Sequence, residues 1–90
     1  MGRYVGIHTV PGFTAEKLRD TTERLGRVFD ARFVRAYSSF AGGKVVCDWE
    51  APTKQAVAKT YAILGLPYDE IVAIEAISER NDGRFATLYL

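Results

Sequence analysis

Hydrophobic residues alternate with polar or small residues in five stretches of the chain, and this period of two predicts five β-strands. The stretches are residues 3–10, 32–38, 44–50, 71–77 and 84–90. Pro-Gly, Gly-Gly and Asn-Asp-Gly sequences follow the first, second and fourth stretches, and such sequences favour tight turns. The pattern therefore predicts short strands joined by compact connections.

Two other stretches have the spacing of amphipathic helices. Thr14 and Thr53 are the expected N-caps, because a threonine hydroxyl accepts the free N–H groups of a first helical turn. The first helix is expected to run to about Phe29. The second is expected to end at Gly65, with Pro67 preventing its continuation.

The resulting order is β-α-β-β-α-β followed by one more strand, which predicts a ferredoxin-like α+β sandwich. We expect a single domain over residues 1–90, with a core at 3–77 and an additional C-terminal edge strand at 84–90. That strand is expected to extend either its own sheet or the sheet of a partner. Right-handed crossover connections place both helices on one face of the sheet.

Strand alternation then assigns side chains to the two faces of the sheet. The helix-covered face is expected to hold Val5, Ile7, Val34, Ala36, Val45, Cys47, Trp49, Val72 and Ile74. The open face is expected to hold Tyr4, His8, Val10, Phe33, Arg35, Tyr37, Val46, Asp48, Glu50, Ile71, Glu75 and Ile77. A solvated sheet face is mostly polar, whereas this one mixes aromatic, aliphatic and charged residues.

Such a mixed face suggests a cover: a second copy of the chain, a ligand, or both. Two such sheets packed face to face would form a dimeric α+β barrel, and we therefore expect a homodimer. The alternative is a monomer in which the tail strand or loops cover part of the face.

One cluster of candidate functional residues emerges from this arrangement. The split βαβ order predicts that the first and third strands are parallel neighbours, so His8 is expected to approach Asp48 and Glu50 on the open face. An imidazole with two carboxylates suits a divalent metal ion or a proton-transfer site. Arg35 is expected opposite Glu50, or opposite Asp48 after a shift of one pair, and would then engage one carboxylate in an ion pair.

Cys47 falls on the helix-covered face, where a small buried core residue is the expected role. A β-bulge near Glu50 would instead turn it towards His8 and form a His/Cys/Glu set.

Composition restricts the remaining functions. The 90 residues include 12 basic and 11 acidic residues without a basic stripe, which argues against nucleic-acid binding. One cysteine excludes an internal disulfide and favours a reducing compartment. No signal peptide and no membrane-spanning run is visible, so we expect a cytoplasmic protein without membrane contact.

Three segments resemble a family of small bacterial ferredoxin-like proteins, largely of unknown function, whose described member binds nickel. They are YVGIHTVPGFTAEKL from Tyr4, CDWEAP from Cys47 and GLPYDEIVAIEAI from Gly65. Together they span most of residues 3–77, and their order and separations agree with the family.

The resemblance implies a dimer and, in at least one branch, nickel bound by histidines and neighbouring groups. It carries His8 over as a candidate ligand, and Cys47 and Glu50 as positions of the CxxEAP segment. This chain departs from the family at Thr60, where members often have a histidine.

The first hypothesis is therefore a homodimeric protein that binds Ni²⁺ or another divalent transition metal through His8, Glu50, Asp48 and Cys47. The alternative is an enzyme or binder of a small, partly aromatic molecule, with His8 as acid/base. Its pocket would be lined by Tyr4, Phe33, Arg35, Tyr37 and Ile71. A structural or regulatory interaction module is the third hypothesis.

Overall fold

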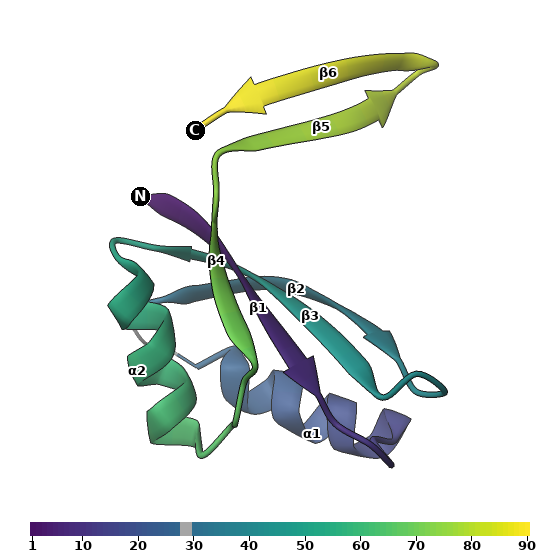
Figure 1. Cartoon of the computed structure of the whole chain (residues 1–90), viewed down its shortest axis with the longest axis vertical. Helices are drawn as coiled ribbons and strands as arrows, with labels where there is room; N and C mark the ends of the chain where they lie inside the picture. The colour runs from purple at the N-terminus through teal and green to yellow at the C-terminus, as the bar shows by residue number, and fades with distance from the viewer. Residues whose placement is uncertain (28–29) are drawn as a thin grey trace.

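The computed structural model describes residues 1–27 and 30–90. Within these residues the chain forms two helices and six strands (Figure 1). They are β1 (Gly2–Thr9), α1 (Ala15–Leu25), β2 (Arg32–Ser39), β3 (Lys44–Ala51), α2 (Lys54–Leu64), β4 (Glu70–Ile74), β5 (Ala76–Asn81) and β6 (Arg84–Tyr89). The α+β class and the order β-α-β-β-α-β of the first six elements are confirmed. Neither of these helices is long and apolar enough to cross a membrane.

The first four strands form one sheet in the order β2-β3-β1-β4, and all neighbours run antiparallel. The predicted parallel pairing of β1 and β3 is wrong: Gly2 lies opposite Ala51, and Thr9 lies opposite Lys44. The reason is topological. Because α1 returns the chain so that β2 runs parallel to β1, the tight turn after β2 must reverse β3 with respect to both.

Both helices begin at their predicted caps. The hydroxyls of Thr14 and Thr53 each accept the backbone N–H three residues later, at 3.2 Å. At its C-terminal end α2 stops at Gly65, whose φ of 68° is the left-handed conformation that glycine adopts without strain. Helix α1 ends at Leu25, earlier than predicted, and Phe29 lies outside the described residues.

The hydrophobic core lies between the sheet and the two helices, which cover the same face of the sheet (Figure 1). Trp49, Tyr61 and Val57 are the largest side chains that are fully buried there. Val45, Cys47 and Trp49 of β3 face this core, as predicted.

The predicted faces of β1 are reversed. Directly opposed residues of an antiparallel pair share a face. His8 lies opposite Val45 and Gly6 lies opposite Cys47, so His8 and Gly6 point towards the helices, and so does Tyr4. The alternating residues, Val5 and Ile7, point to the open face.

Strand β4 is reversed in the same way. Ile71 lies opposite Gly6 and is buried in the core, whereas Val72 and Ile74 lie on the open face. Both faces of β1 and of β4 carry apolar residues, so alternation alone did not determine which face is buried. The strand also ends at Ile74, before the predicted Ile77.

Strand β2 follows the prediction only in its second half. Arg35 lies opposite Asp48, the shifted of the two predicted registers. The register shifts between Phe33 and Arg35, which makes this a β-bulge. Because of that bulge Phe33 lies opposite Trp49 on the core side, with its ring 5.6 Å from the Trp49 ring, and not on the open face.

The C-terminal residues form neither an extension of the main sheet nor a single edge strand. Strands β5 and β6 pair only with each other, as a hairpin that rises from the end of β4 above the open face of the sheet (Figure 1). The Leu90 N–H donates to the Glu75 carbonyl at 2.9 Å and closes the base of the hairpin.

Candidate functional site

His8 is held in a single orientation inside the protein. Its side chain points to the core from β1, and the residue is only 7% exposed. The Nδ1 atom lies 2.8 Å from the backbone carbonyl oxygen of Pro67. A carbonyl oxygen only accepts hydrogen bonds, so Nδ1 must carry the hydrogen and donate it. In the neutral imidazole the lone pair then lies on Nε2, which is buried and has no hydrogen-bonding partner.

The Pro67 carbonyl reaches His8 because of how α2 ends. After Gly65 the chain turns back towards the sheet, and the Leu66 N–H donates to the Tyr61 carbonyl at 2.9 Å. The Asp69 N–H then donates to the Ile7 carbonyl at 2.8 Å, which ties the loop to β1. Pro67 lies between these two bonds, and its carbonyl oxygen therefore reaches the imidazole. Sequence reasoning used Pro67 only as a helix stop and missed its carbonyl as a partner of His8.

Tyr61 is the second polar side chain at this place. The helical pattern predicts it as a packing residue with its hydroxyl at the rim, whereas the whole residue is buried. Its hydroxyl accepts a hydrogen bond from Trp49 Nε1 at 2.6 Å, and its ring meets the His8 ring edge-on at 4.8 Å. Gly6 provides the space, since a Cβ there would collide with the Tyr61 hydroxyl. A glycine inside a strand often marks such a close approach, and this was the available signal.

Cys47 lies on the same side of the sheet as His8, buried as predicted. Burial raises the pKa of its thiol to about 11, against the opposing effect of a hydrogen bond with Tyr61. Burial also raises the pKa of the Tyr61 hydroxyl. Both groups are therefore neutral at pH 7.

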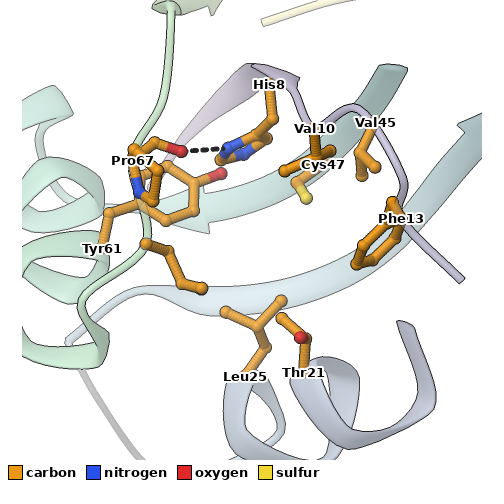
Figure 2. A pocket seen from close by; sticks show the side chains of 10 residues that line it. His8, Val10, Phe13, Thr21, Leu25, Val45, Cys47, Tyr61 and Pro67 are labelled. Atoms are coloured by element: carbon orange, nitrogen blue, oxygen red, sulfur yellow. Dashed lines mark hydrogen bonds between the residues drawn. The ribbon is translucent and has the colours of Figure 1, made fainter. Parts of the chain in front are cut away.

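His8, Cys47 and Tyr61 meet at a cavity of about 70 Å³ that is partly open to solvent. Figure 2 shows it between the sheet, the Pro67 loop and α1, whose Thr21 and Leu25 form the opposite wall. The remaining walls are apolar side chains. The cavity thus combines an apolar lining with two groups that bind transition metals, an imidazole nitrogen and a sulfur.

The predicted carboxylates lie elsewhere. Asp48 is on the open face, where Arg3 Nη2 contacts its Oδ2 at 2.6 Å and Arg3 Nε contacts its Oδ1 at 3.3 Å. Arg35 Nε lies 3.8 Å from the same Oδ2. Arg32 donates to Glu50 at 2.8 Å, and this hydrogen bond lowers the pKa of the Glu50 carboxyl.

The predicted convergence of His8 with Asp48 and Glu50 is therefore wrong. Antiparallel pairing puts the carboxylates at the other end of β1, opposite Val5 and Arg3, and the reversed face puts them on the other side of the sheet. Among the residues that the structure describes, no three His, Cys, Asp or Glu side chains gather as a metal site.

The residues predicted to line a ligand pocket lie on opposite faces of the sheet. Tyr4, Phe33 and Ile71 belong to the core side, whereas Arg35 and Tyr37 lie on the open face. These last two line a groove of about 340 Å³ between the open face and Ile77, Ser78 and Glu79 of the hairpin.

Comparisons with known proteins agree with this architecture. Residues 4–74 match a family described as "Nickel responsive protein SCO4226-like". The crystal structure of SCO4226 from Streptomyces coelicolor A3(2) superposes with a TM-score of 0.74 at 24% sequence identity, covering 80% of this chain and 94% of that chain. No curated protein matches the chain. The family match ends at residue 74, where β4 ends, so the β5–β6 hairpin lies outside it.

Proposed function

The chain belongs to the family of nickel-responsive SCO4226-like proteins, and from this premise we propose that it binds a divalent transition-metal ion at the cavity beside His8, through His8 and Cys47. The family description makes Ni²⁺ the first ion to test. An ion bound there would act as a Lewis acid held in an apolar environment.

The observation that carries this proposal is the state of His8. Metal-binding histidines usually donate one ring N–H to a carbonyl or carboxylate, which fixes the ring and directs the other nitrogen at the metal. His8 has this arrangement: Nδ1 donates to Pro67, and the buried Nε2 has no partner. A buried unpaired acceptor costs about 1–3 kcal/mol, and an ion would remove that cost.

Cys47 is the second donor on the same cavity. Its thiol must lose a proton to bind a metal ion, and its pKa of about 11 opposes that loss at neutral pH. Metal binding through Cys47 therefore releases a proton and becomes tighter as the pH rises. A neutral imidazole and a thiolate together suit Ni²⁺, Zn²⁺ and copper.

The two donors do not complete a coordination sphere within one chain. Thr60, where the resemblance expects a histidine, donates its hydroxyl hydrogen to the Ala56 carbonyl at 2.9 Å and does not line the cavity at His8. The remaining coordination positions would belong to water or to a donor from outside the chain. We therefore expect weaker binding than at a site with three or four protein ligands.

The size of the cavity favours an ion over the alternative, an aromatic ligand. An engineered apolar cavity that binds benzene has about 150 Å³, roughly twice the 70 Å³ found here. A small, partly aromatic molecule is larger than this space. A single metal ion is smaller than it.

The test is calorimetric titration of metal-free protein with Ni²⁺, Zn²⁺ and Cu²⁺, beside the His8→Gln and Cys47→Ser variants. We expect each variant to lose at least about tenfold in affinity. Glu50→Gln is the matched control, because this carboxylate is engaged by Arg32 on the other side of the sheet. Circular dichroism establishes that the variants fold.

Titration in two buffers of different ionisation enthalpy gives the number of protons released. Coordination by Cys47 predicts about one proton per ion for the wild type and none for Cys47→Ser. A sulfur-to-nickel charge-transfer band should appear in the wild type and in Glu50→Gln, and should be absent from Cys47→Ser. Full affinity in His8→Gln, or an equal loss in Glu50→Gln, would contradict the proposal.

A further inference from the structure

Two parts of the chain cover the cavity beside His8 on the side away from the sheet. One is helix α1, which contributes Thr21 and Leu25, and the other is the loop around Pro67 (Figure 2). Cys47 is only 4% exposed, so its sulfur is largely covered in this conformation. The cover that moves more easily therefore decides how an ion or a reagent reaches it.

Helix α1 is weakly anchored to the rest of the molecule. Leu25 is its only buried residue, and every other residue of the helix is half-buried or exposed. Helix α2 has the same length but buries Val57, Thr60 and Tyr61. Segments with few buried apolar contacts open locally at a lower free energy than the whole molecule unfolds. By this criterion α1 opens before α2.

The Pro67 loop, in contrast, is tied down at both ends. The Leu66 N–H donates to the Tyr61 carbonyl at 2.9 Å, and the Asp69 N–H donates to the Ile7 carbonyl at 2.8 Å. The Thr9 hydroxyl adds a hydrogen bond to the Asp69 carboxylate. Moving this loop would break all three bonds, so the loop is the more firmly held of the two covers.

One side-chain contact holds α1 against α2. Arg24 Nη2 donates to the Leu64 carbonyl oxygen at 2.6 Å, and in the described part of the chain this is the hydrogen bond that joins α1 to another element. Leu64 is the last residue of α2, where carbonyl groups lack donors from their own helix and carry the negative end of the helix dipole. A guanidinium is well suited to this position.

We propose that α1 is a lid over the cavity, held closed by the Arg24–Leu64 hydrogen bond, and that it moves away from the sheet to admit an ion to His8 and Cys47. Opening exposes Leu25 and breaks one hydrogen bond, while the sheet and α2 stay packed. The identity of what enters rests on the proposed function, but the motion of α1 does not. The test therefore reads the motion without metal.

The test measures how fast Cys47 in the metal-free full chain reacts with the aromatic disulfide dithiobis(nitrobenzoate). The Cys47 thiolate attacks this disulfide, forms a mixed disulfide and releases one coloured nitrothiobenzoate anion per chain. Burial holds the pKa of the thiol at about 11 in the closed form, so the opened form, in which the thiol regains its ordinary pKa, does most of the reacting.

The urea dependence of this rate separates local opening from global unfolding. Movement of α1 alone exposes little new surface, so the rate should rise with urea much less steeply than the global unfolding constant measured by circular dichroism. An equal dependence would overturn the proposal, because Cys47 would then become accessible only when the whole chain unfolds.

Three variants identify which cover moves. Arg24→Ala should react at least about threefold faster than the wild type, because it removes the charge-assisted hydrogen bond that closes the lid. Arg19→Ala is the matched control, since Arg19 is exposed on the same helix, and it should leave the rate unchanged. Thr9→Val loosens the Pro67 loop and should also leave the rate unchanged. An unchanged rate in Arg24→Ala, or an equal acceleration in Thr9→Val or Arg19→Ala, overturns the lid.

Stopped-flow mixing with Ni²⁺ connects the lid to the metal site. Arg24→Ala should bind the ion faster than the wild type by the same factor by which its thiol reacts faster. If calorimetry detects no metal binding while the thiol measurements hold, the proposed function fails and the lid stands. If Ni²⁺ binds Arg24→Ala no faster than the wild type, α1 is not the route of entry and the lid proposal is overturned.

Discussion

At Gly6 the backbone of β1 is in close contact with the Tyr61 hydroxyl. The Tyr61 hydroxyl lies where a side chain of Gly6 would be, and it accepts the Trp49 N–H there. This contact keeps Tyr61 against His8 and sets one wall of the cavity. One missing side chain thus makes room for the buried polar cluster.

Gly6→Ala is therefore expected to destabilise the protein by about 1–3 kcal/mol, because the new methyl group must displace a fully buried ring. Urea unfolding monitored by circular dichroism measures the change. Gly26→Ala, at the end of α1, is the control: its φ of −74° suits any residue and its Cβ would be in ordinary contact. We expect Gly26→Ala to be neutral or slightly stabilising. Equal losses in both variants would refute the steric explanation.

Strand periodicity correctly placed His8 near the end of β1, but it assigned the side chain to the wrong face of the sheet. Its partner atom belongs to Pro67, a backbone carbonyl that any residue type carries. Side-chain identity therefore gives no signal for this hydrogen bond.

Among the elements, α2 has the most direct effect on the site. It carries Tyr61, and its C-terminal end at Gly65 directs the chain so that Pro67 meets His8. Its start depends on Thr53, whose hydroxyl accepts the Ala56 N–H. The first turn of α2 has no acidic residue to support the helix dipole, so this cap works alone.

Thr53→Ala is expected to cost about 1 kcal/mol of stability, the usual value for losing a threonine cap. Thermal unfolding of the variant against the wild type measures it. Thr53→Ser keeps the hydroxyl and should stay close to the wild type. If the serine variant lost as much as the alanine variant, the methyl group rather than the cap would be responsible.

At the scale of the whole molecule, buried neutral groups make stability depend on pH. Folding raises the pKa of the Cys47 thiol from its ordinary value of 9.0 to about 11. The unfolded chain therefore loses this proton at lower pH than the folded chain, and stability must fall as the pH rises between these values. Well below pH 9 the thiol is neutral in both states and contributes no pH dependence.

We expect the free energy of unfolding to decrease above pH 9 with a slope that approaches about 1.4 kcal/mol per pH unit. Urea unfolding between about pH 8 and pH 9.5 measures the onset of this slope, in a range where tyrosine ionisation in the unfolded chain, centred near pH 10, still adds little. Cys47→Ala removes the thiol and should flatten the curve in that window. An unchanged slope in this variant would assign the effect to other groups.

The sequence by itself determined the kinds and the order of the first six elements, from β1 to β4. Strand alternation, the Thr14 and Thr53 caps, and Gly65 are local signals, and local signals specify local structure. They also determined that Val45, Cys47 and Trp49 share the buried face of β3, because the other face of that strand carries Asp48 and Glu50. A strand with one polar face has only one way to be buried.

Only the tertiary structure decided the faces of β1 and β4, the bulge before Arg35 and the separate hairpin. β1 and β4 have apolar residues on both faces, so burial of either face is compatible with their pattern. The choice depends on Tyr61 filling the space beside Gly6, a contact between residues 55 positions apart. The direction of β3 follows from the path of the chain, and that direction separates His8 from the carboxylates and leaves it with Cys47. Local sequence patterns cannot specify which face of these strands is buried or in which direction β3 runs. Both depend on how segments far apart in the sequence pack against one another.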